Sequence, residues 1–336
     1  MRITTNALIR NYKTNLSTSI NNLNISRNHV MTQRSFNTAA EDPASAARAS
    51  QLHRKYYKNQ DNLKMLDEAQ SRQDGQEDAL RQVSDMVKSI SKNYNIQALN
   101  GTNQTAEVRQ SYASAIRQFQ QSMVLSLNST YEDTFLFAGS DGKNPPFELS
   151  PNGTLSYRGI DVNASKGSAD YQKLKTMSNE NLYVDLGMGL SMDDYDQVVS
   201  SSAFNMSLPG INAVGYGNDE NGMSNNIIVM AGKLADALEA DTFDADQFRN
   251  LMNKFDTLGT NLTNQITELG VKTEFLTTTK DRLDNAEISI QEQMSSVEGV
   301  DMAEAITNYS WDQYAYNAAL KVGTSILSSS FIDFMR

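Results

Sequence analysis

The chain of 336 residues contains no cysteine and only two histidines, His29 and His53. Without thiols it can form no disulfide, no iron–sulfur cluster and no cysteine-based zinc site, and it has no thiol nucleophile. Two imidazoles are too few for a histidine-rich metal centre, and both stand in polar helical surroundings typical of solvated side chains. We therefore expect no metal, no cofactor, no catalytic residues and no enzymatic activity.

The chain also lacks an excess of positive charge and any long apolar run. It has 29 Lys and Arg residues and 40 Asp and Glu residues, which gives a formal net charge of −11. Such a balance argues against a nucleic-acid partner, because binding DNA or RNA requires neutralising phosphates. No stretch of 18 apolar residues is present, so we expect no membrane insertion. Residues 1–30 lack the continuous apolar segment of a secretory signal, so we expect no cleaved signal peptide.

Proline and glycine are scarce in both flanks of the chain. The five prolines leave residues 44–144 and 210–336 free, and 11 of the 18 glycines lie between Gly139 and Gly222. Because these residues break or loosen helices, this distribution predicts helical flanks, including helices over about 44–92 and 105–130, around an irregular or β-rich middle. In that middle, Asn152-Gly153 between two short apolar runs predicts a hairpin.

The C-terminal third carries the clearest periodicity, with apolar residues seven apart and without a gap. A repeat sustained in this way predicts one very long helix with a narrow apolar seam, which would form the core of a helical rod. The residues of this predicted rod core are Phe248, Phe255, Leu262, Leu269, Leu276, Leu283, Ile290 and Val297.

Each end of the chain carries a further apolar stripe on an otherwise polar helix. A single stripe needs a partner to bury it, and the simplest pairing is with the stripe at the other end. Because both ends carry one, we also favour packing between copies of the chain, and we predict an assembly interface. Its residues are Ile9, Leu16, Ile20, Leu23 and Val30 at the N-terminus, and Met302, Ile306, Tyr309, Tyr316, Leu320, Leu327 and Phe334 at the C-terminus.

Together these patterns predict a mainly α fold. We expect an elongated helical rod, built from N- and C-terminal segments in antiparallel coiled-coil-like packing, with a β-rich middle insert. The predicted domains are a terminal assembly domain (1–40 and 298–336), a helical rod domain (41–138 and 226–297) and an outer middle domain (139–225).

Residues 34–48 read RSFNTAAEDPASAAR at the start of the predicted helix over 44–92, and Asn100-Gly101-Thr102 follow its end. The first string is similar to the signature that opens the first long rod helix of the flagellin superfamily, and the second to the turn that ends that helix. One branch of this superfamily, the junction branch, joins the flagellar hook to the filament. The passage FLFAGS at 135–140 followed by PPF at 145–147, the stretch DMAEAI at 301–306 and the ending SFIDFMR favour the junction branch. The resemblance covers about residues 1–160 and 240–336.

The resemblance implies a function that composition does not show. Such a protein is a structural component of the bacterial flagellum, outside the cell, and assembles as a ring between hook and filament through its terminal helices. It leaves the cell unfolded through the flagellar type III channel, without a cleaved signal peptide. The implied partners are other hook-associated proteins, flagellin, further copies of itself, and an export chaperone on the C-terminal region. A chain without cysteine suits this route, since no disulfide could cross-link it during threading.

Three alternatives stay open at this point. The chain could be a flagellin that forms the filament itself, although its ending and the PPF passage argue against this. It could be a secreted coiled-coil effector, which would not explain the matching strings at both ends. An enzyme or adhesin carried on the insert at 140–225 would need a catalytic constellation that the sequence does not show.

Overall fold

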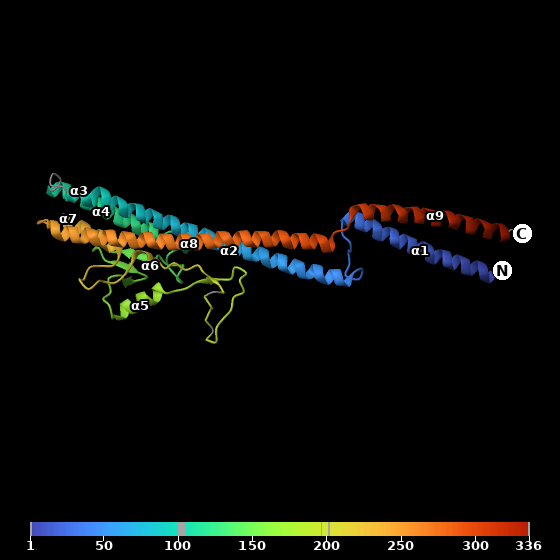
Figure 1. Cartoon of the computed structure of the whole chain (residues 1–336), viewed down its shortest axis with the longest axis horizontal. Helices are drawn as coiled ribbons and strands as arrows, with labels where there is room; N and C mark the ends of the chain where they lie inside the picture. Colours follow the sequence, from blue (N-terminus) through green and yellow to red (C-terminus); the bar gives the residue numbers. More distant parts are fainter. Residues whose placement is uncertain (1, 100–104, 196, 201, 335–336) are drawn as a thin grey trace. The chain divides into compact units, whose positions relative to one another are not determined.

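Figure 1 shows the computed structural model of the chain. It describes residues 2–99, 105–195, 197–200 and 202–334, with side chains described from residue 7 to residue 325. The turn predicted at Asn100-Gly101-Thr102 lies outside the described residues.

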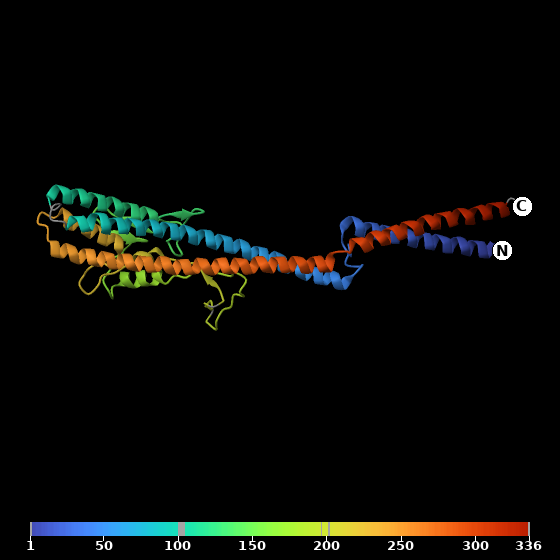
Figure 2. The same cartoon turned by 45° about the horizontal axis from the view of Figure 1, so that its top comes forward.

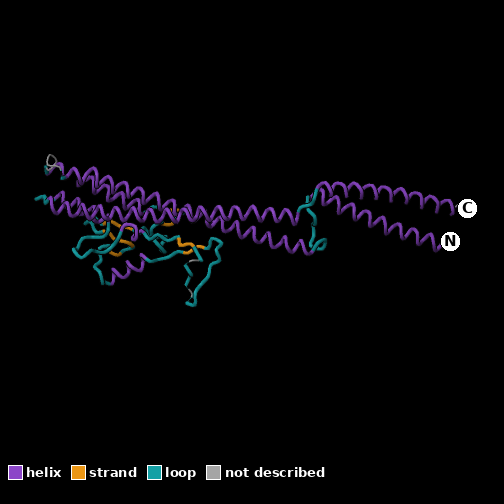
Figure 3. The backbone as a smooth tube through the Cα atoms, viewed as in Figure 1, coloured by secondary structure: helices purple, strands orange, loops and turns teal. Residues whose placement is uncertain are grey.

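Long helices occupy both flanks of the chain, as Figure 3 shows in purple. This confirms the predicted mainly α fold, and the helix predicted over 105–130 matches α4 to within a few residues. The helices are α1 (Arg2–Thr32), α2 (Pro43–Ser89), the π-helix η1 (Ile90–Asn95), α3 (Ile96–Ala98), α4 (Ala106–Leu127), α5 (Ala169–Ser178), α6 (Gly210–Val214), α7 (Ile227–Glu239), α8 (Ala245–Glu298) and α9 (Met302–Phe334).

Short strands lie in the middle of the chain, between α4 and α7. They are β1 (Thr130–Tyr131), β2 (Thr134–Phe135), β3 (Phe147–Leu149), β4 (Leu155–Tyr157), β5 (Ile160–Asp161), β6 (Tyr183–Val184) and β7 (Phe204–Asn205). All pairings are antiparallel: β1 with β2, β6 with β7, and a sheet in the order β3-β4-β5. The predicted hairpin is β3–β4, with Phe147 opposite Tyr157 and Gly153 in its turn at a φ of 82°.

The described chain divides into two compact units. The first consists of residues 1–60 and 284–336, and the second of residues 61–283. The divisions fall inside α2 and α8, and the insert shares a unit with the helical segments on both sides of it. These boundaries differ from those of the three predicted domains, which remain a prediction.

The main hydrophobic core lies in the second unit and joins α2, α4, α7 and α8 to the strands of the insert. Helix α7 stands at its centre, since it is apolar on nearly every side and must be covered on every side. Asn226 caps this helix: its side-chain oxygen accepts hydrogen bonds from the N–H groups of Ile228 (3.0 Å) and Val229 (3.1 Å).

Helices α2 and α8 run antiparallel, as predicted. In the second unit Asp67 pairs with Lys280 at 2.7 Å, whereas Ser91 bonds to Asp256 at 2.6 Å. Residue numbers that rise along one helix therefore meet numbers that fall along the other. In the first unit the same direction holds, because His53 meets Glu298 whereas Gln60 meets Glu287.

Candidate assembly interface

The predicted rod-core residues of α8 lie on one face of that helix. Phe248, Phe255, Leu262, Leu269, Leu276 and Leu283 are all at most 5% exposed. Ile290 and Val297, which belong to the first unit, are half-buried. The seven-residue spacing thus marks a continuous buried row, as expected where a helix packs along another helix.

Helices α1 and α9 form a second antiparallel pair, within the first unit. The chain leaves α1 beside the point where it enters α9: the Val300 N–H donates to the Gln33 carbonyl at 3.2 Å, and the Ser35 N–H to the Glu298 carbonyl at 2.8 Å. In both views the two helices continue side by side toward the chain ends (Figures 1 and 2). The stripes therefore meet within one chain, which is the simplest of the pairings considered from the sequence.

Burial defines the seam between α1 and α9, and its residues alternate at spacings of three and four. This is the pattern of a two-helix coiled coil, in which every contact position faces the partner. On α1 the buried or half-buried positions with this spacing are Ile9, Tyr12, Leu16, Ser19, Leu23, Ser26 and Val30, and His29 beside Val30 is also half-buried. On α9 they are Met302, Ala305, Tyr309, Asp312, Tyr316, Ala319 and Gly323.

Three predicted interface residues do not lie in this seam. Ile20 is 38% exposed, Ile306 50% and Leu320 40%. The side chains of Leu327 and Phe334 lie outside the described residues. The seam on α9 also includes small and polar side chains, namely Ala305, Asp312, Ala319 and Gly323, which a search for apolar positions does not find. The wider assembly interface remains a prediction.

Gly323 of α9 lies directly against the side chain of Tyr12 on α1. A side-chain carbon added at this position would collide with the hydroxyl of Tyr12, whose ring lies over the glycine. Glycine costs a helix about 1 kcal/mol relative to alanine. Its presence inside α9 is explained by the room that it leaves for Tyr12.

Replacing Gly323 by valine should weaken the terminal pair, because the branched side chain displaces Tyr12. Overpacking of this kind costs about 1–3 kcal/mol, so amide hydrogens of α1 and α9 should exchange roughly 5- to 100-fold faster. Ala318→Val, at an exposed position of the same helix, is the matched control. Equal exchange in both variants would contradict the close approach, and Tyr12→Ala should restore protection in the Gly323→Val chain.

The outward side of the terminal pair is unusually apolar. On α9, Trp311 is 68% and Tyr314 70% exposed, and both line a shallow hollow with Ile306, Thr307 and Ser310. On α1, Leu8 is 51%, Ile25 44% and Met31 74% exposed. Scattered surface leucines are ordinary, but a tryptophan and a tyrosine one turn apart on an exposed helix form a patch of the kind found at protein interfaces.

A buried carboxylate ties the segment after α1 to α2 and α8. The Glu298 side chain is 13% exposed and pairs with Arg34 at 3.2 Å and with His53 Nε2 at 2.6 Å. His53 is therefore held in a polar contact, contrary to the solvated position that we expected. The sequence could not reveal this, because 245 residues separate the two partners.

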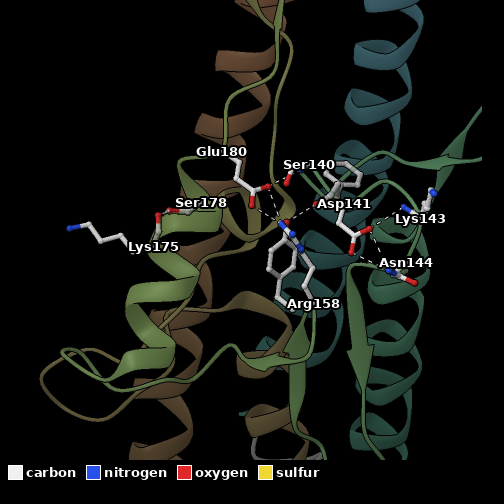
Figure 4. Close-up of polar contacts among 10 residues, drawn as sticks. Ser140, Asp141, Lys143, Asn144, Arg158, Lys175, Ser178 and Glu180 are labelled. Atoms are coloured by element: carbon white, nitrogen blue, oxygen red, sulfur yellow. Dashed lines mark hydrogen bonds and ion pairs between the residues drawn. The ribbon is translucent and has the colours of Figure 1, made fainter. Parts of the chain in front are cut away.

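A second, partly buried ion pair holds the base of the insert together (Figure 4). The Arg158 guanidinium, in the tight turn between β4 and β5, donates from Nη1 to both oxygens of Glu180 at 2.8 and 3.0 Å. The same carboxylate accepts the Ser140 N–H at 2.8 Å. Gly139, at a φ of 65°, lets the backbone approach, since a side chain there would meet the Glu180 carboxylate.

Glu180→Gln should destabilise the insert at neutral pH and cost much less in acid. Burial raises the pKa of Glu180, but the hydrogen bonds from Ser140 and Arg158 outweigh burial, so the pKa lies below its usual 4.5. A depressed carboxyl pKa contributes stability above pH 4.5 that is lost as the pH falls through the folded-state value. We expect a loss of about 1–2 kcal/mol at pH 7 that shrinks toward pH 3.

Urea unfolding of both chains at pH 7 and pH 3 measures this difference. Glu148→Gln, at an exposed position of β3, is the matched control and should change little at either pH. A Glu180→Gln penalty that is the same at both pH values would show that the charge of this carboxylate does not stabilise the insert.

Among the described residues, no group of three or more His, Asp or Glu side chains is arranged to hold a metal ion. None of the described helices is both long and apolar enough to cross a membrane.

Comparison with known proteins agrees with this geometry. The model of the bacterial flagellin N-terminal helical region matches residues 3–141, and that of the C-terminal helical region matches residues 252–330. No curated protein sequence matches the chain.

Solved structures share the fold at low sequence identity. A flagellar hook-associated protein from Vibrio parahaemolyticus is 16% identical, with a TM-score of 0.59 over 77% of this chain and 100% of its own. FlgL from Bacillus cereus is 14% identical, with a TM-score of 0.51 over 73% and 99%. Hook-associated protein 3 from Legionella pneumophila is 12% identical, with a TM-score of 0.50 over 74% and 98%.

The two family regions cover well over half of the chain, and they hold the paired helices α1 and α9 and the long helices α2 and α8. The chain therefore belongs to the bacterial flagellin family.

Proposed function

We propose that this protein is a structural component of the bacterial flagellum that joins the hook to the filament. Members of the flagellin family are structural rather than catalytic, and the solved structures that share this fold are described as hook-associated proteins. The sequence strings at 135–147, 301–306 and 330–336 support the same branch. The protein acts by assembling, without a cofactor.

The proposal rests on the difference between the two faces of the terminal helix pair. The seam between α1 and α9 buries one face of each helix, whereas Trp311, Tyr314 and Ile306 remain exposed on the outward face of α9. Exposed aromatic surface on a rigid helix pair fits a contact with other subunits. In this proposal the outward faces of the pair bind neighbouring copies, and the copies form a ring.

The remaining partners follow from the same role. One side of the ring contacts the other hook-associated proteins and the other side leads to flagellin. Before assembly, an export chaperone covers the C-terminal region, where the apolar surface of α9 would otherwise promote aggregation. The chain crosses the flagellar type III channel unfolded and acts outside the cell.

Removing the gene from its host tests the role directly. The deletion strain should build hooks, secrete flagellin monomers into the medium and lack filaments, because the filament would have no base to grow on. Electron microscopy of the cells and immunoblots of the medium measure this, and the reintroduced gene is the control. Normal filaments on the deletion strain would remove the junction role.

One alternative within the family is a flagellin that forms the filament. The same deletion strain separates the two roles, since loss of a filament subunit leaves no secreted flagellin in the medium. The similarity of the ending and of the PPF passage to junction proteins favours the first role.

A further inference from the structure

The outward face of α2 carries a basic stripe in a chain that is acidic overall. Arg48, Arg54, Lys55 and Lys58 are exposed, and no acidic residue occurs between Pro43 and Gln60. Positions 48, 55 and 58 follow one another at spacings of seven and three, and position 54 is adjacent, so the four cations share one helix face. Among the described residues none of the four forms an ion pair, although Arg34 and His53 nearby do.

The later part of the same helix carries the opposite charge. Asp74, Glu77 and Asp78 crowd three carboxylates into five residues, and among the described residues only Glu77 has an ionic partner, Arg81. Burial, then the charges of Glu77 and Asp78, raise the pKa of Asp74. Among the described residues, Asp74 and Asp78 of the acidic cluster (Asp74, Glu77, Asp78) form no ion pair, and Arg81 is the one cation paired with the cluster.

From these two faces we propose that the basic stripe of one copy (Arg48, Arg54, Lys55, Lys58) binds the acidic cluster of the neighbouring copy in the assembled ring. The inference rests on the proposed function, and it adds a polar contact between copies to the apolar one at the terminal helices.

The charge of the chain favours a second copy of the same protein as the partner of the basic stripe. With a net charge of −11, two copies repel each other over most of their surfaces. Contact is favoured only where unlike charges meet, and local complementarity then fixes the register of the copies. Because the stripe and the cluster are different surfaces of one chain, their contact is head-to-tail. Such a contact does not close as a dimer and instead propagates into a ring or a helix.

Charge reversal and charge exchange test the contact in isolated flagella. Each variant gene replaces the host's own copy, so that all of this protein in the cell is the variant. The number of protein copies per flagellum is then measured by quantitative immunoblot. Lys55→Glu/Lys58→Glu and Asp74→Lys/Asp78→Lys should each lower incorporation at least about fivefold, because each puts like charges opposite one another. The chain with all four changes should return to within about twofold of wild type.

The matched control is Lys166→Glu/Lys175→Glu, which makes the same change in net charge at exposed positions of the insert. It should stay within about twofold of wild type. Circular dichroism of the purified variants verifies that they fold. As a measurement without substitutions, carbodiimide treatment of flagella built from mixed light and heavy-isotope copies should link Lys55 or Lys58 of one copy to Asp74 or Asp78 of another.

Two results would overturn the inference alone: normal incorporation of Lys55→Glu/Lys58→Glu, or incorporation of the fourfold variant that is as low as that of either pair. The second result would indicate that the basic stripe binds a different flagellar protein. Absence of the wild-type chain from isolated flagella would instead overturn the proposed function.

Discussion

A chain trimmed to residues 36–299 is expected to stay folded and to lose assembly completely. Both terminal helices are removed, and with them the outward patch of α9 that we propose as the contact between copies. The main hydrophobic core extends from Ala79 to Leu269 and contains no residue of α1 or α9. Helix α2 keeps its start, because the Asp42 side chain accepts hydrogen bonds from the Ala44 and Ser45 N–H groups at 3.1 and 3.0 Å.

Circular dichroism measures whether the trimmed chain stays folded, and incorporation into flagella measures whether it still assembles. The helical signal should fall by no more than the 31 residues of α1 and the 33 residues of α9. The urea midpoint of the remaining chain should be unchanged, and no trimmed protein should appear in isolated flagella. A larger loss of helix would show that the rest of the chain depends on its ends for folding.

Phe255→Ala is expected to destabilise the second unit strongly. The ring is 0% exposed and lies in the main core, on the buried row of α8. Truncation leaves a cavity the size of the ring, and a buried phenylalanine lost in this way costs about 3–5 kcal/mol. Since domains are stable by only about 5–15 kcal/mol, a large part of the stability of the second unit should disappear.

Urea unfolding of the purified chain measures this cost. Val271→Ala is the matched control, because Val271 lies on the same helix but is 66% exposed, and it should cost about 0.5 kcal/mol or less. If both variants unfolded at the same urea concentration, the row of α8 that includes Phe255 would not belong to the hydrophobic core.

The long helices were predictable because their signals are local and repeated. Few prolines interrupt either flank, and the heptad row from Phe248 to Leu283 is the buried row of α8. An apolar residue at every seventh position over such a length is typical of a helix that buries one face. The sequence therefore predicted both the helix and its buried face. The β3–β4 hairpin was predictable for a similar reason, since Asn152-Gly153 favours one type of tight turn.

The terminal seam was predicted only in part, because its contacts depend on shape as well as on apolar character. Gly323 and Ala319 line the seam by leaving room, whereas Ile306 and Leu320 are apolar and lie outside it. The hydrogen bond between Glu298 and His53 and the ion pair between Glu180 and Arg158 were not predictable at all. Their partners are ordinary polar residues in the sequence, and only folding brings them together.

The sequence by itself determined the secondary structure of the flanks, the position of the insert and the family. These properties follow from composition, from periodicity and from short strings, all of which are read along the chain. Only the folded structure shows which face of each terminal helix packs against its partner and which remains exposed. Among the described residues it also shows that the basic stripe of α2 and the carboxylates of Asp74 and Asp78 form no ion pair, whereas Glu77 pairs with Arg81. Burial depends on what packs against a residue, and packing partners more than two hundred residues apart are set by the fold.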